Sequence, residues 1–301
     1  MMKIFLAGGS GAIGIPLVRA MLAAGHQVTA LTRSAAKGGS LRALGASVAV
    51  ADALDRDALI NAVTSAHPTH VVHQLTALPK DGPRRPSDLE PTNRLRIEGT
   101  RNLLDAAIAA GAKRFLVGSF AILSPRGQAM PAHDAAAEAV ESMETQVLEA
   151  NARNAIEGVV LRYGMFYGLE TPSTQAMIEM VRKRRLPVVR GDSGQLPVIH
   201  IDDAVSATVL ALDRAPAGSV YDVVDDQAVS MTDIVQSLAK YTGSSQPYRL
   251  PAWLPRLVAP YLLRITSVRM PLSNAKAKSE LGWRLQYPTM KAGMREMFHA
   301  A

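Results

Sequence analysis

The chain has 301 residues, of which 48% are hydrophobic, and its 33 Lys and Arg against 26 Asp and Glu give a formal net charge of +7. This length and apolar content allow a large buried core, while the absence of cysteine excludes disulfides, thiolate metal sites and a cysteine nucleophile. No apolar run approaches the ~20 residues of a membrane-spanning helix, so we expect a cytoplasmic protein, and the scattered basic residues do not favour nucleic-acid binding.

A glycine-rich turn follows the first predicted strand, at residues 4–7, and precedes a helix expected over residues 15–24. Gly8 lets the chain turn out of the strand, Gly11 lets the backbone approach a pyrophosphate, and Gly14 lets the helix pack closely on the strand. The helix N-terminus offers unpaired N–H groups to an anion. A turn that serves only as a tight corner is the alternative. We expect dinucleotide binding by Gly8, Ser10, Gly11, Ala12, Ile13 and Gly14.

Strands and helices then alternate over the next 150 residues or so. Apolar runs predict strands at residues 28–31, 48–50, 71–73, 114–118 and 158–162, and helices are expected at 41–44, 57–63, 94–110 and 135–150. This rhythm is typical of an α/β protein with a doubly wound, Rossmann-type parallel sheet covered on both faces. We assign residues 1–169 to an NADP-binding domain.

From about residue 171 the rhythm changes. Helices are expected at 175–185, 202–212 and 231–241 and from residue 290, with strands at 198–201 and 221–224. Residues 170–301 are expected to form a smaller α+β substrate-binding cap, with a strand and helix near 196–224 returning to the first domain. Such a cap would close the crevice at the carboxyl ends of the strands.

The segment after the second strand bears on the choice of coenzyme. It reads Thr32-Arg33-Ser34 and lacks the Asp or Glu that holds the ribose hydroxyls of NAD. Arg33 can pair with a 2′-phosphate, with the hydroxyls of Thr32 and Ser34 in reach. We therefore expect NADP(H) to be preferred over NAD(H); a surface arginine on a loop is the alternative interpretation.

Several segments together resemble the extended or atypical short-chain dehydrogenase/reductase superfamily, in its epimerase/dehydratase branch. The matching segments are residues 7–14, 51–55, 72–77, 98–104, 114–119, 161–168 and 198–204. The resemblance implies that Asp52, with Ala53 beside it, accepts a hydrogen bond from the adenine amino group. It also implies that Gln74, Leu75 and Thr76 line the path to the nicotinamide, and that Tyr163 and Gly164 lie beside its ribose.

The catalytic residues of that family are only partly present. Family enzymes use a tyrosine and a lysine four residues later, aided by a serine or threonine at the preceding strand end. Ser119 fits the serine position and would donate to a substrate oxygen that gains negative charge; a hydroxyl satisfied within the core is the alternative. The tyrosine and lysine would fall near Ala136 and Val140, and the Tyr287 to Lys291 spacing lies outside the expected context.

Other polar residues are weaker candidates. His133, Asp134 and Glu138 lie on the segment that usually carries the base, although Asp134 fits a helix cap better. The spacing of His67, His70 and His73 does not favour a metal site, because strand residues three apart face opposite sides. We expect either Asp202 or Asp203, which follow His200, to cap a helix.

These observations predict an NAD(P)-dependent oxidoreductase of a small carbonyl, hydroxyl or sugar-like metabolite. The missing tyrosine and lysine leave two alternatives open: a non-catalytic NADP(H)-binding regulator, and a redox-neutral epimerase or isomerase of a nucleotide sugar. The expected partner is a small molecule, with a homodimer through the helices at 94–110 and 135–150 as an option.

Overall fold

The computed structural model describes residues 1–79, 82–83, 85–124, 134–191, 194–251, 253–254, 269–270 and 272–299. Its main sheet has seven parallel strands in the order β10-β6-β5-β4-β1-β2-β3. The strand order reverses between β1 and β4, and ligands of open α/β sheets bind outside the carboxyl ends at such a point. The predicted Rossmann-type sheet is confirmed. Its strands are β1 (Lys3–Ala7), β2 (Gln27–Thr32), β3 (Ser47–Val50), β4 (His70–His73), β5 (Arg114–Phe120), β6 (Glu157–Tyr163) and β10 (Val220–Val223).

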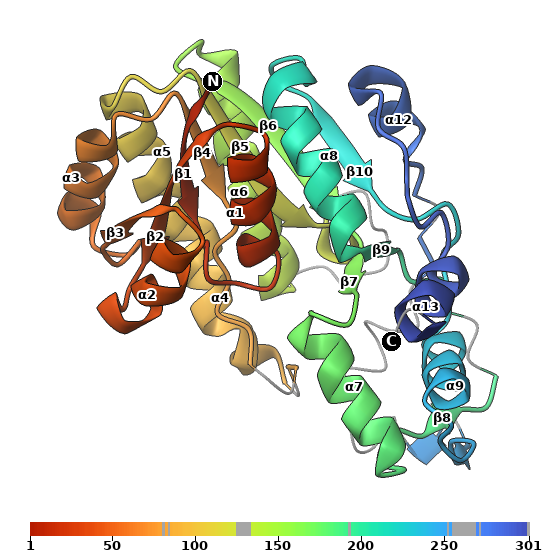
Figure 1. The fold of residues 1–301 in the computed structure, drawn as a ribbon. Helices are drawn as coiled ribbons and strands as arrows, with labels where there is room; N and C mark the ends of the chain where they lie inside the picture. Colours follow the sequence, from red (N-terminus) through yellow and green to blue (C-terminus); the bar gives the residue numbers. More distant parts are fainter. Residues whose placement is uncertain are drawn as a thin grey trace.

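Helices cover both faces of this sheet (Figure 1). One face packs against α1 (Gly14–Ala23), α2 (Ala35–Ala43) and α8 (Ile201–Arg214), and the other against α3 (Arg56–Ala66), α5 (Thr100–Ala109) and α6 (Ala135–Ala152). Each face has its own apolar core, and the central strands between them are buried on both sides. This burial explains why the central strands are continuous apolar runs.

The helix expected over residues 94–110 is divided into three elements. It comprises α4 (Glu90–Arg94), a π-helical turn η2 (Leu95–Gly99) and α5, and it is preceded by the 3-10 turn η1 (Pro86–Leu89). The Ile97 carbonyl in the π turn accepts a hydrogen bond from Gln146 Nε2 of α6 at 3.2 Å. The periodicity predicted the helix but not this interruption, whose contact with Gln146 joins residues 49 positions apart in the chain.

Most of the remaining elements form a third apolar cluster beside the sheet, where Figure 1 shows α7, α9 and α13 gathered below α8, whereas α12 packs in the core that contains α8. Short strand pairs complete it, with β7 beside β9 and β8 beside β11. The elements are η3 (Ala121–Leu123), β7 (Met165–Tyr167), α7 (Pro172–Arg182), β8 (Val188–Val189), β9 (Val198–His200), α9 (Met231–Tyr241), β11 (Arg249–Leu250), α12 (Ala275–Leu281) and α13 (Met290–His299). Among the helices described, none is long and apolar enough to cross a membrane.

Two predicted helix caps had different outcomes. Asp134 caps α6 as expected, accepting from the N–H groups of Ala136 and Ala137 at 3.0 and 3.1 Å. At α8 the prediction was wrong, because the helix begins at Ile201 and His200 is the N-cap, accepting from the Asp202 N–H. The Asp203 carboxylate instead accepts the N–H groups of Gln286 and Tyr287 at 2.7 and 2.9 Å. Asp203 therefore fixes the carboxyl-terminal segment to α8.

Candidate functional site

The turn between β1 and α1 is tight at its two ends. Gly8 has a φ of +95°, and a Cβ there would lie 2.5 Å from the carbonyl oxygen of Gln74. A Cβ at Gly14 would lie 2.1 Å from the carbonyl oxygen of Gly8. Only glycine fits at either position without moving the backbone, because both contacts are with main-chain atoms. The glycines at positions 8 and 14 of the glycine-rich motif are therefore both required by close contacts with backbone atoms.

The middle of the turn faces solvent. Ser10, Gly11 and Ala12 are exposed, whereas the Ile13 side chain is buried. Ile13 is the N-cap of α1 and supplies no side-chain hydrogen bond to the first turn. The first N–H groups of α1 are thus left uncapped by a side chain, as an anion-binding helix terminus requires. The turn therefore has close backbone contacts at both ends, and its exposed middle leads to an uncapped helix N-terminus. This arrangement fits the pyrophosphate of a dinucleotide.

The carboxyl ends of β2 and β3 lie side by side, since Thr32 pairs with Val50 in the sheet. Arg33 follows β2 and is exposed, and within the described ranges no ion pair to a carboxylate is found for it. Thr32 is buried and its hydroxyl is engaged within the loop, donating to the Ser34 carbonyl and accepting the Ser34 N–H, both at 3.2 Å. This corrects the expectation that Thr32 is a free donor for a 2′-phosphate.

Asp52 and Ala53 follow β3 beside this loop. The Asp52 carboxylate is half-buried and accepts the Leu54 N–H at 3.0 Å, which orders the turn. The Ala53 side chain is buried, and its carbonyl accepts from Asn102 Nδ2 at 3.0 Å. The Leu54 N–H occupies one carboxylate oxygen of Asp52, so the other oxygen can still accept from an adenine amino group.

His73 fixes the backbone that follows β4. It is 1% exposed, its Nδ1 accepts the Leu75 N–H at 3.1 Å, and its Nε2 then donates to Thr100 Oγ1 at 3.0 Å. Burial, with the nearby Arg96 charge, lowers the pKa of His73 to about 4, so the ring is neutral. It thereby holds the segment of Leu75, half-buried, and Thr76, exposed, at the switch point. Nothing in the sequence pattern singled out His73 for this positioning role.

The Gln74 side chain extends over Gly118, near the carboxyl end of β5, to contact Tyr163 at the end of β6. A Cβ at Gly118 would lie 2.1 Å from Gln74 Oε1, so the glycine makes room for this side chain. Gln74 Nε2 donates to the Tyr163 hydroxyl at 3.1 Å, and that hydroxyl also shares a 2.7 Å hydrogen bond with Thr208 of α8. Burial raises the pKa of Tyr163 to about 12. Tyr163 is thus a neutral anchor for Gln74 rather than a proton donor near neutral pH.

Gly164 has a packing reason of its own. A Cβ there would lie 2.7 Å from the main chain of Val198 in β9. Its N–H donates to the Val223 carbonyl at 3.0 Å. The glycine therefore allows the chain that leaves β6 to pass directly against β9.

Ser119 lies in a buried polar cluster that the sequence did not indicate. Its hydroxyl donates to Glu144 Oε1 at 2.6 Å, and Arg162 donates to both oxygens of the same carboxylate, with Nη2 to Oε2 at 2.5 Å. The three side chains are 2 to 6% exposed. Strand alternation turns Ser119 toward α6, where its proton is committed to Glu144. This corrects the expectation that Ser119 donates to a substrate oxygen.

The positions inferred for the catalytic tyrosine and lysine lie in an apolar contact. Ala136 and Val140 are 3% and 0% exposed and pack with Leu89 and Leu123. Neither side chain can transfer a proton. Glu138 is exposed on the same helix, and the candidate His133 lies outside the described residues.

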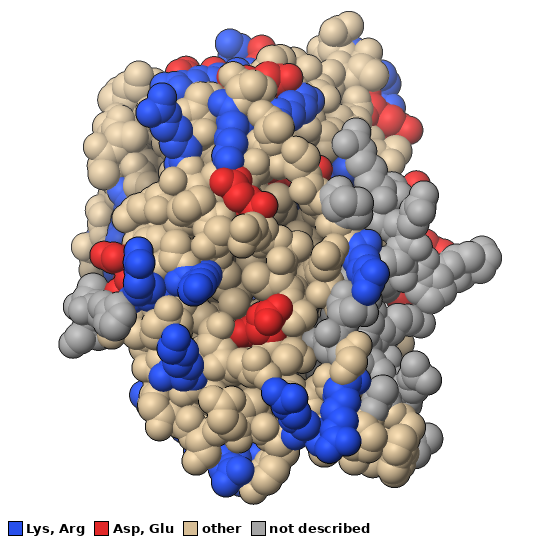
Figure 2. Space-filling view, turned by 90° about the vertical axis from the view of Figure 1, so that its right-hand side faces the viewer, with Lys and Arg blue, Asp and Glu red and all other residues tan. Residues whose placement is uncertain are grey.

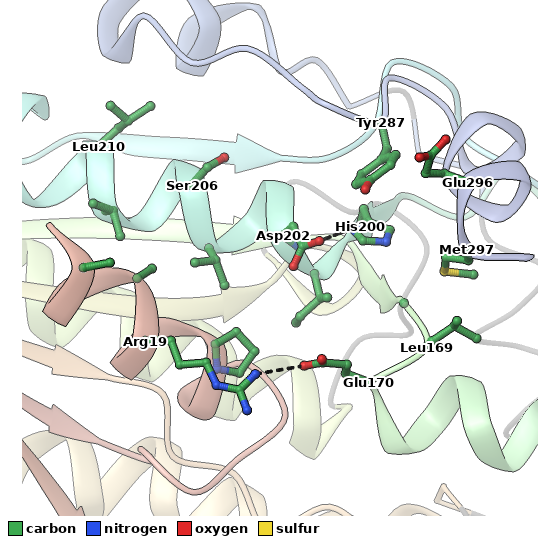
Figure 3. A pocket seen from close by; sticks show the side chains of 17 residues that line it. Arg19, Leu169, Glu170, His200, Asp202, Ser206, Leu210, Tyr287, Glu296 and Met297 are labelled. Atoms are coloured by element: carbon green, nitrogen blue, oxygen red, sulfur yellow. Dashed lines mark hydrogen bonds and ion pairs between the residues drawn. The ribbon is translucent and has the colours of Figure 1, made fainter. Parts of the chain in front are cut away.

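The cavity in Figure 3 lies between α1, α8 and the carboxyl-terminal segment. Its volume is about 970 Å³, and Arg19 pairs with Glu170 across it at 3.6 Å. The rings of His200 and Tyr287 lie 4.0 Å apart, and burial lowers the pKa of His200 to about 4. Tyr287 lines this cavity, whereas no residue of the glycine turn at 8–14 does. Within the described ranges, no three His, Asp or Glu side chains gather as metal ligands.

Figure 2 shows Lys and Arg side chains spread over the face it presents rather than gathered into one patch. A protein that neutralises many phosphates of a nucleic acid usually presents a continuous basic stripe.

Residues 4–224 match the model of the NAD dependent epimerase/dehydratase family. A 3-diazoavenalumate denitrifying reductase of a Streptomyces species is 36% identical over 312 residues, covering 97% of this chain and 99% of the relative. A 4-hydroxy-2-methyl-3-oxo-4-farnesyl-3,4-dihydroquinoline-1-oxide ketoreductase of Stigmatella aurantiaca is 26% identical, covering 97% and 84%. Among solved structures, the UDP-glucose 4-epimerase of Thermus thermophilus in complex with NAD has a TM-score of 0.77 at 23% identity, covering 99% and 98%.

Proposed function

Because the chain belongs to the NAD-dependent epimerase/dehydratase family, we propose that it is an NADP(H)-dependent reductase of a small electrophilic metabolite. Family membership and relatives named as reductases support an NAD(P)-dependent oxidoreductase. The observation that carries the proposal is the glycine turn, closed at Gly8 and Gly14 by backbone contacts and open between them.

The proposal gives each segment at the switch point a role. The turn at residues 8–14 would hold the pyrophosphate, Asp52 the adenine and Arg33 the 2′-phosphate, while Leu75 and Thr76 would border the nicotinamide. When bound, the reduced coenzyme supplies a hydride. Residues 1–169 would form the coenzyme domain and residues 170–301 the cap over the substrate.

Replacement of Arg33 with alanine should weaken NADPH binding and leave NADH binding almost unchanged. A charge-assisted hydrogen bond contributes about 1.5–3 kcal/mol, so we expect the Kd for NADPH to rise roughly 10- to 100-fold. The measurement is calorimetric titration of each coenzyme. Arg153→Ala, which removes a guanidinium that is 68% exposed at the end of α6, is the matched control. An equal loss of affinity for both coenzymes would show that Arg33 does not read the 2′-phosphate.

The substrate class can be argued from the missing proton donor. Reduction of a carbonyl leaves an alkoxide that must be protonated, whereas Ala136 and Val140 carry no proton to give. An aryl diazonium cation is different, because the cation and one hydride give the arene and dinitrogen with no proton consumed. The 36% identical relative is named for denitrifying reduction of a diazo compound. We therefore propose an aromatic diazo compound as the substrate.

Carbonyl reduction is the second candidate, favoured by the relatives named a ketoreductase and a 2-alkyl-3-oxoalkanoate reductase. In that reaction water would have to supply the proton, since Tyr163 has a raised pKa and its hydroxyl is buried.

A substrate panel separates these functions. We expect NADPH oxidation, followed at its absorbance band, to be fastest with an aryl diazonium salt, with one dinitrogen released per NADPH after subtraction of the rate without protein. Oxidation only with an aryl ketone or a 3-oxo acid would favour the second candidate. Coenzyme binding without consumption by any substrate would favour a regulator, and conversion of UDP-glucose without net change in absorbance would favour an epimerase.

A further inference from the structure

His200 carries a hydrogen-bond donor that no group in the described part of the chain accepts. Its side chain is 4% exposed, and burial lowers its pKa to about 4, so the ring is neutral. Nδ1 accepts the Asp202 N–H at 3.3 Å, which leaves the proton of the ring on Nε2. Among the described residues, Nε2 has no hydrogen-bond partner. Because a buried donor without an acceptor destabilises a fold, this N–H group calls for a molecule that binds against it.

The unpartnered nitrogen lies at the wall of the cavity in Figure 3, whose volume is about 970 Å³. A Cβ on Gly168 would lie 3.6 Å from Nε2, so this nitrogen faces the segment of residues 168–170 that lines one side of the cavity. The rings of Tyr167 and Tyr287 pack against the His200 ring, with centroids 5.1 and 4.0 Å from it, and fix its orientation. A ligand in the cavity therefore meets a donor that is already in place.

Tyr287 supplies a second donor on the same wall. Its hydroxyl accepts from Gln286 Nε2 at 3.0 Å, and within the described ranges nothing accepts its own proton. A carbonyl oxygen has two lone pairs and so can accept from two donors at once. The adjoining rings of His200 and Tyr287 are thus suited to a carbonyl group of a ligand.

The charges around the cavity disfavour an anion. Arg19 is paired with Glu170. Asp202 and Glu296 also line the cavity, and no Lys or Arg of the described residues pairs with either carboxylate. Burial, together with the charges of Asp202 and Glu296, raises the pKa of Tyr287, so both carboxylates lie near its hydroxyl. A ligand that brings a positive charge to this wall is therefore favoured.

We propose that this cavity binds a small organic cation that carries a protonated amine and a neutral carbonyl on an apolar body. The carbonyl accepts from His200 and Tyr287, the ammonium group lies by Asp202 and Glu296, and the apolar body packs against half-buried side chains such as Leu169 and Val209. None of the residues assigned above to the coenzyme lines the cavity. The inference therefore concerns a separate site and does not rest on the proposed function.

Four ligands with one phenyl body test the inference by calorimetric titration without coenzyme. Phenylalaninamide carries both groups, 2-phenylethylamine only the ammonium, 3-phenylpropanamide only the carbonyl, and 3-phenylpropanoate a carboxylate. At about pH 6 an α-amino group is protonated, while the His200 ring, with a pKa of about 4, stays neutral. We expect phenylalaninamide to bind with a Kd of about 1 mM or tighter. Each ligand that lacks one group should bind about three- to tenfold more weakly, and 3-phenylpropanoate should show no saturable binding.

Two replacements of His200 separate its two nitrogens. Asparagine offers an acceptor near the place of Nδ1 and can still cap α8, but it has no donor at the place of Nε2, whereas the longer glutamine has one. His200→Asn should weaken phenylalaninamide about three- to tenfold and leave 2-phenylethylamine unchanged, and His200→Gln should retain most of the affinity for both. Glu296→Gln should weaken both amines. Glu141→Gln, which neutralises an exposed carboxylate on α6, is its matched control and should change neither.

Three results would overturn the inference. They are the absence of saturable phenylalaninamide binding, which would leave the cavity to water alone, binding of 3-phenylpropanoate as tight as that of phenylalaninamide, and unchanged phenylalaninamide affinity in His200→Asn. Binding of 2-phenylethylamine by His200→Asn shows that the variant keeps its cavity. If that binding is lost, Tyr287→Phe, which removes one hydroxyl, takes its place, and unchanged phenylalaninamide affinity in it would overturn the inference. Since no titration uses a coenzyme, these outcomes are independent of the proposed function.

Discussion

Replacement of Gly14 with alanine is expected to abolish coenzyme binding. The new Cβ would lie 2.1 Å from the carbonyl oxygen of Gly8 and within 2.7 Å of the Gly9 carbonyl group. These are backbone atoms, so the turn and α1 must separate, which costs about 1–3 kcal/mol of stability and displaces the N–H groups from the pyrophosphate. We expect the Kd for NADPH to rise more than about 100-fold, as for the loss of two charge-assisted hydrogen bonds. Calorimetric titration and thermal unfolding measure the two effects.

Gly39→Ala is the matched control for this substitution. Gly39 lies within α2, and a Cβ there would meet no atom within 4 Å. Alanine should stabilise that helix by about 0.5–1 kcal/mol and leave NADPH affinity unchanged. If Gly14→Ala keeps NADPH affinity within about twofold of the wild type, the glycine turn does not hold the coenzyme as described.

Replacement of Glu144 with alanine is expected to destabilise the whole fold. Glu144 is 2% exposed and accepts hydrogen bonds from Ser119 and Arg162, which is itself 6% exposed. The variant leaves the Arg162 charge buried without its carboxylate, which typically costs about 3–5 kcal/mol. The midpoint of thermal unfolding should fall by roughly 10 °C.

A control variant and a double variant show whether the stability lost in Glu144→Ala comes from the broken ion pair. Glu149→Ala removes a carboxylate from the same helix, but its pair with Arg153 is 61 and 68% exposed, so the change should cost less than about 1 kcal/mol. Removing both charges with Glu144→Leu and Arg162→Met should restore most of the lost stability, since a buried ion pair is often replaceable by packed apolar groups. A Glu144→Ala protein as stable as Glu149→Ala would contradict the assignment of a buried ion pair.

The sheet could be predicted because its signals are local. The run at residues 4–7 and the glycines that follow it mark a strand, a turn and a helix within one short segment. The central strands β4, β5 and β6 are buried along most of their length, so each contains a short apolar run in the sequence. The family resemblance and the Rossmann-type fold were therefore both predicted from the sequence and confirmed.

The site contacts could not be predicted, because they join residues far apart in the chain. Ser119 fits a strand-end donor in sequence, but its hydroxyl donates to Glu144, 25 residues later, whose carboxylate is held by Arg162, 43 residues after Ser119. Gly118 matters because Gln74 crosses it from the neighbouring strand. Thr32 is a different case, because its hydroxyl bonds Ser34 only two residues away, in a loop conformation that no sequence motif specifies.

The start of α8 was also not predicted correctly, for a different reason. His200 lies one residue before α8, and its ring accepts the Asp202 N–H, so the N-cap role that we expected for an aspartate is filled by His200. The sequence His200-Ile201-Asp202-Asp203 contains three residues able to cap a helix, so composition alone does not choose among them. The choice follows from Asp203 pairing with Gln286 and Tyr287 near the far end of the chain.

Calorimetric titration of the wild-type protein with NADPH and with NADH is the most direct test of the central claim, that the turn at residues 8–14 holds a dinucleotide whose 2′-phosphate pairs with Arg33. We predict saturable binding of both coenzymes, with NADPH bound at least about tenfold more tightly, as one charge-assisted contact provides. Saturable binding of NADH with no advantage for NADPH would contradict the role of Arg33, and the absence of binding by either coenzyme would contradict the whole account.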